Sequence, residues 1–208
     1  MTAGGFNAEA FRTKARGLAG EEGDFGHGDH LLNPDIVERL RRETLREAAV
    51  LIPVVDRGDA AGLILTRRTQ SMRQHSGQVA FPGGAVDADD ASPEAAALRE
   101  AYEEIGLETG FVETLGRLPA YLTTTGFRIT PVIGLVRADY SLTINREEVD
   151  AAFEVPFAFV MNPDNHRRES RIWEGKQRFY YSMSYLEHHI WGVTAGILRV
   201  LYERLHLD

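Results

Sequence analysis

Residues 81–107 read FPGGAVDADDASPEAAALREAYEEIGL and predict a glycine-rich turn followed by one helix. Three residues mark the start of this helix. Ser92 is a hydroxyl cap, Pro93 suits the first helical position, and Glu94 lies beside the positive end of the helix dipole. Gly106 marks its predicted end. Within the helix, an apolar stripe at i, i+4 and i+7 is expected to pack against a sheet. The stripe consists of Leu98, Tyr102 and Ile105.

The other face of the predicted helix is acidic. At roughly 100° per residue, Glu100, Glu103 and Glu104 lie within about 60° of one another, and no lysine occurs between Gly84 and Gly110. Like charges four residues apart destabilise a helix by about 0.2 to 0.5 kcal/mol. A solvated acidic surface is one interpretation. The other is a site for a hard divalent ion such as magnesium, which binds carboxylates together with substrate phosphates.

The preceding turn favours the ion site, because the glycine pair Gly83-Gly84 allows a ligand to approach the backbone closely. At this point the stretch resembles the Nudix hydrolases. Their sequence box has a glycine, five residues, a glutamate and seven residues before Arg-Glu-apolar-x-Glu-Glu-x-Gly-apolar. Residues 99–107, REAYEEIGL, match the second half. Counted from Gly84, the first glutamate position falls on Asp90, with one extra residue before Arg99, so the role of Asp90 is open.

The resemblance implies a Nudix-like α/β/α sandwich with a mixed β-sheet, and a metal-dependent hydrolase that cleaves a diphosphate linked to a nucleoside. Glu100, Glu103 and Glu104, helped by the backbone at Gly84, would hold Mg²⁺ or Mn²⁺. Such an ion would position a water and lower its pKa. Arg99 is expected to brace the loop or a glutamate.

The general base is one of several carboxylates. Glu103 comes first among the residues of the box, and Glu104 is also assigned a catalytic role. The alternative is a carboxylate from a later loop, where the segment 143–157 offers Glu147, Glu148 and Glu154. Glu148 is the preferred one of these, because it lies in a polar loop just before a predicted strand.

A second stretch, ILTRRTQSMRQHSGQVAFPGG (residues 64–84), lies directly upstream. It resembles the motif of the coenzyme A pyrophosphatase branch of the Nudix enzymes. That motif is Leu-Leu-Thr-x-Arg-Ser/Ala, three residues, Arg, three residues, Gly, three residues, Phe-Pro-Gly-Gly. The matching residues are Leu65, Thr66, Arg68, Arg73, Gly77, Phe81, Pro82, Gly83 and Gly84.

The branch resemblance implies hydrolysis of coenzyme A or acyl-coenzyme A to 3',5'-ADP and 4'-phosphopantetheine or its acyl form. Arg68 and Arg73 would bind substrate together with Gly83 and Gly84, since the arginine fork suits phosphate. Arg67 alternates with Arg68 along a strand and is expected to point away. The alternatives are a broader pyrophosphatase acting on ADP-ribose-like or dinucleotide substrates, and a non-catalytic nucleotide-binding module. The intact box glutamates argue against the module.

Composition excludes several other classes. The chain has 208 residues, 43% of them hydrophobic, and a net charge of -8, which argues against binding to nucleic acid or an anionic membrane. No run approaches the roughly 20 apolar residues of a membrane helix. Without cysteine there is no disulfide, in keeping with a cytoplasmic location. We expect a nucleotide-like small molecule as the partner, and a monomer or homodimer.

The chain is expected to divide into an N-terminal helical extension with a mobile loop, residues 1–45, and a Nudix hydrolase domain, residues 46–208. Residues 8–18 predict a short amphipathic helix. The segment 20–30, GEEGDFGHGDH, predicts the mobile loop with solvated histidines. Asn33 is expected to cap a helix that continues to about residue 46.

Apolar runs separated by Gly, Pro and Thr predict a mixed sheet, with a hairpin at Gly175-Lys176. The run 190–205 has apolar residues at helical spacing and predicts a closing helix. An aromatic-rich neighbourhood precedes it, for which core packing is the simpler interpretation and contact with a base or pantetheine arm the alternative. It consists of Tyr185, His188, His189 and Trp191. The strand-like runs are 48–55, 60–68, 77–81, 111–121, 131–140, 151–160, 169–174 and 177–185.

Overall fold

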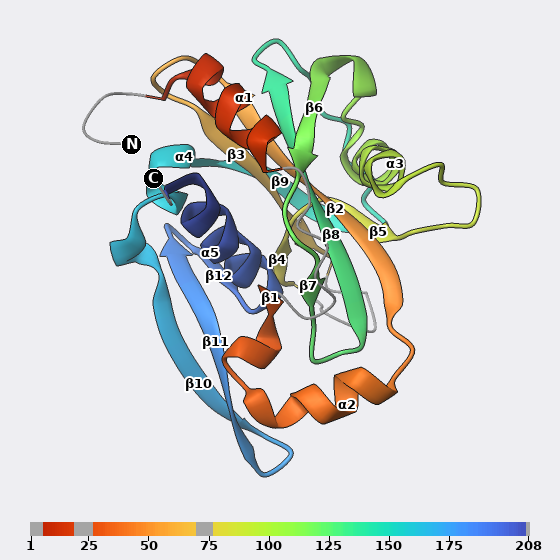
Figure 1. The fold of residues 1–208 in the computed structure, drawn as a ribbon. Coiled ribbons are helices and arrows are strands. Elements are labelled where there is room, and N and C mark those ends of the chain that lie inside the picture. The colour runs from red at the N-terminus through yellow and green to blue at the C-terminus, as the bar shows by residue number, and fades with distance from the viewer. Residues whose placement is uncertain (1–5, 19–26, 70–76, 207–208) are drawn as a thin grey trace.

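The computed structural model describes residues 6–18, 27–69 and 77–206 (Figure 1). A mixed sheet of nine strands forms its centre. Two long strands, β2 (Arg46–Asp56) and β8 (Phe127–Arg137), run parallel to each other along their whole length. The other strands of this sheet are β1 (His27–Gly28), β3 (Gly62–Arg68), β4 (Val79–Ala80), β5 (Gly83–Ala85), β6 (Val112–Arg117), β7 (Tyr121–Leu122) and β9 (Val149–Pro156).

Alternation along the central strand separates two hydrophobic cores. In β2, Ile52 and Val54 belong to a cluster that includes α5 (Val193–His206), and Leu51 and Val55 to a second cluster beneath α3 (Pro93–Ile105). This is the period of two that a strand imposes on its side chains. The sheet is therefore covered by helices on both faces, which confirms the predicted α/β/α sandwich with a mixed sheet (Figure 1).

A smaller antiparallel sheet packs against α5. It consists of β10 (Arg167–Trp173), β11 (Lys176–Tyr185) and β12 (His188–Trp191). Glu174 and Gly175 connect the first two strands with φ angles of 49° and 73°, as a two-residue hairpin with the twist of its strands requires. The predicted hairpin and closing helix are thus confirmed, with the turn one residue earlier than Gly175-Lys176 because Lys176 already belongs to β11.

The N-terminal residues contribute to the same cores. Helix α1 (Ala8–Gly17) packs on β6 and buries Phe11 and Ala15. After η1 (Asp29–Leu31) and η2 (Pro34–Ile36) comes α2 (Val37–Arg42), whose Leu40 contacts Leu122 of β7. The expected helix to residue 46 is shorter than predicted, because Arg46 already pairs with Phe127 in the sheet.

Asn33 has a different role from the one predicted. Its side chain makes no cap hydrogen bond to the following helix. The residue is buried, and its amide instead donates to the Phe179 carbonyl and accepts from the Phe179 N–H, at 3.0 and 2.9 Å. These bonds satisfy an unpaired edge of β11, so Asn33 connects the N-terminal segment to the small sheet.

The predicted mobile loop is ordered in its last residues. Residues 19–26 lie outside the described residues, but residues 27–30 form β1 and the start of η1, and His30 is 6% exposed. The expectation of solvated histidines was therefore wrong. The cause is non-local: β1 pairs with β7, and the Asp29 carboxylate accepts hydrogen bonds from Tyr121 Oη at 2.9 Å and Thr124 N at 2.8 Å.

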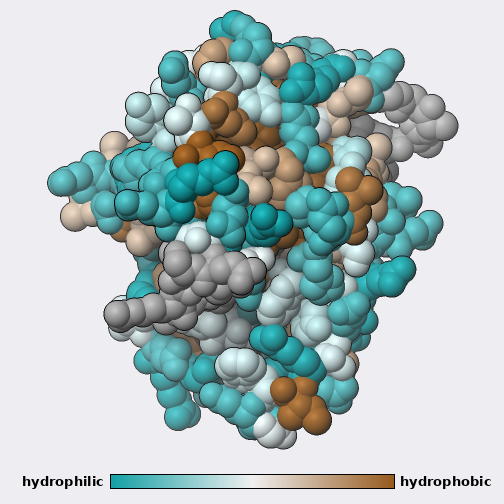
Figure 2. Space-filling view, turned by 180° about the vertical axis from the view of Figure 1, so that it is seen from behind, coloured by the Kyte–Doolittle hydropathy of each residue, from teal (hydrophilic) through white to brown (hydrophobic). Residues whose placement is uncertain are grey.

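The strand predicted over 151–160 ends early. Strand β9 stops at Pro156, and Phe157–Val160 form the short helix α4, which buries Phe157 and Val160. The remaining 3-10 turns are η3 (Thr109–Phe111) and η4 (Pro163–Asn165). Seen from behind, the surface is mostly hydrophilic, and hydrophobic side chains gather in only a few separate places (Figure 2).

Candidate active site

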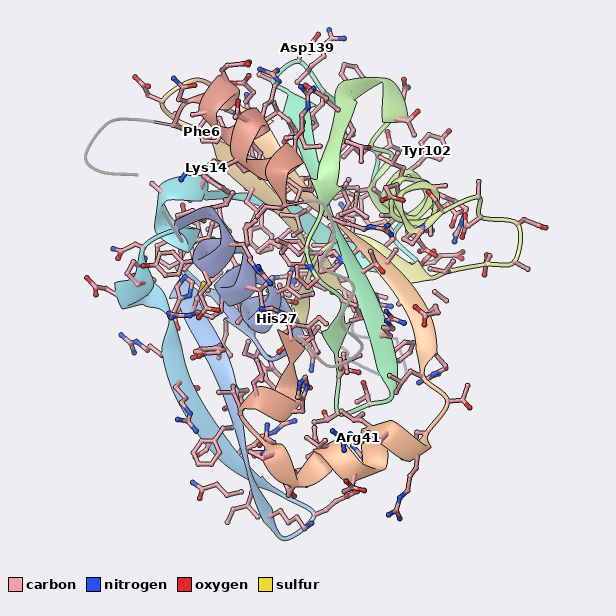
Figure 3. All side chains as sticks on the ribbon, in the orientation of Figure 1. Phe6, Lys14, His27, Arg41, Tyr102 and Asp139 are labelled. Atoms are coloured by element: carbon pink, nitrogen blue, oxygen red, sulfur yellow. The ribbon has the colours of Figure 1, made fainter. Side chains whose placement is uncertain are left out.

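Helix α3 forms as its local signals predict. Ser92 Oγ accepts a hydrogen bond from Ala95 N at 3.2 Å, and the helix ends at Gly106, whose φ of 66° lies in the left-handed region that favours glycine. The predicted packing stripe was wrong in one position. Tyr102 is 58% exposed and points away from the sheet, while Ala97 and Ala101 are fully buried (Figure 3). Small alanines let the helix axis approach the sheet closely.

The glycine pair is a strand and not the predicted turn. Gly83–Ala85 form β5, which pairs antiparallel with β2. A Cβ on Gly83 would lie 2.4 Å from the Ala49 carbonyl oxygen, and a Cβ on Gly84 would lie 2.5 to 2.6 Å from the carboxylate of Glu100. Both glycines are therefore required by close approach, the first to a neighbouring strand and the second to Glu100 of α3.

Glu104 is the most buried of the three helix glutamates, with a side chain that is 3% exposed. It accepts a hydrogen bond from Gly83 N at 3.3 Å, and Arg68 Nη1 lies 3.5 Å from its Oε1. Burial raises the pKa of Glu104 to about 7. The neighbouring Glu100 and Glu148 add to this rise, while Arg68 and the Gly83 N–H oppose it. A buried carboxylate in this setting is stabilised by any additional positive charge.

Glu100 and Glu103 are both bound by Arg99. Its Nη1 donates to Glu100 Oε1 at 2.9 Å and to Glu103 Oε2 at 3.0 Å. Burial raises the pKa of Glu100, and Arg99 opposes the rise while Glu103 and Glu148 add to it. The same guanidinium donates to both oxygens of Asp90, at 2.9 and 3.1 Å. Arg99 thus braces the loop and the glutamates as expected, and Asp90 gains the role that the sequence left open.

Glu148 lies beside these carboxylates, in the loop directly before β9. Asn145 Nδ2 donates to Glu148 Oε1 at 3.0 Å, and Asn145 N donates to the Glu104 carbonyl at 2.9 Å. Thr69 N, at the end of β3, donates to the Glu148 carbonyl at 2.9 Å. The loop is therefore bonded to both α3 and β3. Asn145 was missed by the sequence reasoning, because its role depends on contacts with elements far away in the chain.

Of the other predicted residues, some lie at the helix glutamates and others lie away from them. Arg68 reaches Glu104, as described above. Glu154 lies elsewhere, because Arg57 and Tyr140 Oη bind its carboxylate at 2.6 Å each. Glu147 is exposed and its N–H bonds only within its own loop, to Asn145. Arg73 lies outside the described residues, so its predicted contact with substrate stays a prediction.

The donor set fits a hard divalent ion. Glu100, Glu103, Glu104 and Glu148 offer carboxylate oxygens on adjacent elements, and magnesium and manganese favour such ligands. Among the residues that the structure describes, no three acidic or histidine side chains are gathered at the spacing of a bound ion. Arg99 contacts two of the four instead. The negative charges of Glu103 and Glu148 nevertheless act on Glu100 and raise its pKa, and a divalent ion would neutralise this repulsion.

The sequence profile of the NUDIX domain matches residues 45–178. The chain belongs to the Nudix family. An uncharacterized Nudix hydrolase, NudL of Escherichia coli K12, is 43% identical over 180 residues, which cover 86% of this chain and 91% of NudL. NudL of Shigella boydii is 44% identical over the same coverage.

Two solved structures are similar to part of the chain. RenU, a Nudix hydrolase from M. smegmatis, is 27% identical with a TM-score of 0.41, covering 53% of this chain and 70% of its own. The Nudix domain of Shewanella oneidensis NrtR, solved with ADP ribose, is 19% identical with a TM-score of 0.45 and covers 58% and 79%.

The protein is therefore a Nudix hydrolase, an enzyme that acts on nucleoside diphosphate derivatives, and enzymes of this family generally use divalent metal ions. Glu100, Glu103 and Glu104 occupy the glutamate positions of the Nudix box, and β5 and α3 hold them together. Every helix in the described part of the chain is too short or too polar to span a lipid bilayer.

Proposed function

We propose that this Nudix hydrolase cleaves the diphosphate of coenzyme A or acyl-coenzyme A. The products are 3',5'-ADP and 4'-phosphopantetheine or its acyl form. The observation that carries the proposal is the position of the second sequence motif. Its residue Arg68 lies 3.5 Å from Glu104, and its last two glycines form β5 against the catalytic helix. The described residues Arg68, Gly83 and Gly84 of this motif thus lie beside the box glutamates Glu100 and Glu104, which supports the proposal.

Each side chain has a defined role in this proposal. Glu100, Glu103 and Glu104, with the backbone at Gly84, hold Mg²⁺ or Mn²⁺ in the acidic site. The bound ion supplies charge neutralisation at the diphosphate and lowers the pKa of a water. Arg68 binds a phosphate oxygen, because its guanidinium already points toward the acidic helix from the end of β3. A cation is needed there, since the protein carries a net charge of -8 and would otherwise repel the substrate.

Glu148 acts as the general base. Asn145 Nδ2 occupies its Oε1, which orients the carboxylate and leaves Oε2 to accept a proton from the attacking water. The backbone bond from Thr69 N fixes the loop against β3, the strand that carries Arg68. Glu103 is the alternative base, but it is half exposed and bonded to Arg99.

The test is a comparison of substrates. Coenzyme A, ADP-ribose and a dinucleotide are offered to the purified full chain with Mg²⁺ or Mn²⁺, and the products are separated by chromatography. The expected result is 3',5'-ADP from coenzyme A, with turnover lost in Glu103→Gln. The proposal fails if coenzyme A is left intact while ADP-ribose or the dinucleotide is cleaved. That outcome would support the broader pyrophosphatase.

The assignment of the base has its own test. Glu148→Gln should lower kcat by about 100-fold or more, the scale of general base catalysis. Glu147→Gln is a matched control one residue away, because Glu147 is exposed and its N–H bonds only within the loop. Near-normal turnover of Glu148→Gln would assign the proton transfer to another group.

A further inference from the structure

A pocket lies where the end of β3 and the start of β4 meet β12, and β4 and β12 lie side by side (Figure 1). Its volume is about 330 Å³, which is at the lower end of the range for small-molecule sites. The described residues that line it are Arg67, Gly77, Gln78, Val79, Glu187, His188, His189 and Trp191. The proposed roles in hydrolysis involve none of these residues.

Two aromatic side chains of the pocket, His188 and Trp191, are packed against neighbouring side chains. The His188 ring stacks on Phe153 with centroids 3.6 Å apart and an angle of 6° between the planes. Trp191 is fixed by Tyr180, whose ring centroid lies 5.5 Å away, and by the guanidinium of Arg171, 4.6 Å from its own centroid. Because these rings are ordered by their neighbours, a planar ligand would lose little free energy in ordering them.

The polar groups of the pocket favour an anion attached to that planar ligand. Arg67 lines the pocket, and Arg171 adds a second guanidinium behind Trp191. Glu187 is the only acidic residue among the described lining residues. In a chain of net charge -8, these guanidinium groups place positive charge at the pocket. Arginine binds phosphate through paired hydrogen bonds, and aromatic side chains stack on nucleobases.

The pocket adjoins the active site through the hairpin itself. Arg67 and Arg68 are successive residues of β3, and the pairing of β3 with β9 shifts register between them. Arg68 reaches Glu104, and Arg67 lines the pocket. Gln78, which also lines the pocket, is bonded through its carbonyl to Arg68 N at 3.0 Å. A ligand in the pocket is therefore next to the strand end that contacts the diphosphate.

We propose that this pocket binds the 3'-phosphorylated adenosine end of the substrate, with the base against Trp191 and the 3'-phosphate on Arg67. The inference rests on the proposed function, because coenzyme A carries a 3'-phosphate in addition to its diphosphate. It gives Arg67, which the sequence motif leaves unspecified, the task of distinguishing a 3'-phosphorylated nucleotide from one without that group.

Binding is measured by calorimetry on the full chain carrying Glu103→Gln, with 3',5'-ADP and with 5'-AMP. Adding Arg67→Gln should weaken 3',5'-ADP binding by about 10- to 100-fold, the loss expected for a hydrogen bond to a charged group. Binding of 5'-AMP should change by less than about threefold, because it has no 3'-phosphate. Arg42→Gln is the matched control, since the Arg42 side chain is 81% exposed on α2.

Fluorescence gives a second, independent measurement. The chain has two tryptophans, and Trp173→Phe leaves Trp191 as the only reporter. Trp173 is 55% exposed at the end of β10, so this change should not disturb folding. Stacking of adenine should quench Trp191 when 3',5'-ADP is added.

The possible outcomes distinguish failure of the pocket inference from failure of the proposed function. If coenzyme A is cleaved but Arg67→Gln leaves 3',5'-ADP binding unchanged, the pocket inference is overturned and the proposed function stands. If coenzyme A is not cleaved while 3',5'-ADP binding depends on Arg67, the pocket stands and the proposed substrate falls. Absence of both binding and Trp191 quenching in the parent protein also overturns the pocket.

Discussion

Gly84→Ala tests the geometry of the catalytic helix by adding one methyl group. The new Cβ would lie 2.5 to 2.6 Å from the three carboxylate atoms of Glu100, whereas ordinary contact begins near 3.4 Å. The carboxylate must therefore move by about 1 Å. A displacement of that size in a catalytic group is expected to lower the rate by about 100-fold.

The same substitution should leave stability nearly unchanged, because the displaced atoms are the far end of a flexible side chain and not backbone. The assay is steady-state hydrolysis of the best substrate, together with a thermal unfolding curve. Gly110→Ala is the control, since no atom lies within 4 Å of its added Cβ. If Gly84→Ala keeps kcat within threefold of the parent, Glu100 does not need its observed position and the reasoning is refuted.

Three further substitutions probe the contacts that support the site and the fold. Arg99→Gln removes the donor shared by the loop and the helix glutamates, so the free energy of unfolding in urea should fall by about 2 kcal/mol; an unchanged value would contradict the bracing role. Gly196→Ala would place a Cβ 2.1 Å from Tyr121 Oη and should destabilise the fold by about 1 to 3 kcal/mol, seen as a lower Tm. The hydrogen bond from Arg57 lowers the pKa of Glu154 in the folded protein. The ionised carboxylate therefore stabilises the fold at pH values above the pKa of an ordinary glutamate, and this stabilisation is lost as the pH falls through the lowered pKa. Glu154→Gln should cost no more than about 1 kcal/mol at pH 7, because both side chains are partly exposed, and the difference should shrink as the pH is lowered through the lowered pKa in urea titrations.

The parts of the fold that follow local rules were predictable from the sequence. Helix α3 carries its own start and stop signals. In the structure its first and last residues lie directly next to the predicted caps Ser92 and Gly106. The hairpin at Glu174-Gly175 likewise depends on two residues that adopt positive φ angles. Such signals act over a few residues, so a single sequence contains them.

Features that depend on distant partners were missed or wrong. Gly83 and Gly84 resemble a turn, but pairing with β2 makes them a strand. Tyr102 was expected in the core because it is large and apolar at helical spacing, yet the alanines on the neighbouring face allow closer packing. Asn33 has the residue type of a cap and instead bonds to β11, more than 140 positions away.

In the candidate site too, the features that follow from local sequence were predictable and those that depend on distant residues were not. Arg99 and the three box glutamates lie on one helix, so their proximity follows from helix periodicity. The approach of Arg68 and Glu148 to Glu104 does not, since β3 and the loop before β9 must first fold against α3. Asn145, which orients Glu148, carries no sequence signal that separates it from an ordinary loop residue.

The most direct test of the central claim is a Mn²⁺ titration of the full chain followed by electron paramagnetic resonance. Glu103→Gln should weaken Mn²⁺ binding by at least about tenfold in the presence of a nucleoside diphosphate, since it removes one negatively charged ligand. Glu154→Gln, whose side chain is bound by Arg57 away from the site, should bind Mn²⁺ like the parent. Equal Mn²⁺ affinity in the parent and Glu103→Gln would contradict the assignment of the helix carboxylates as the metal site.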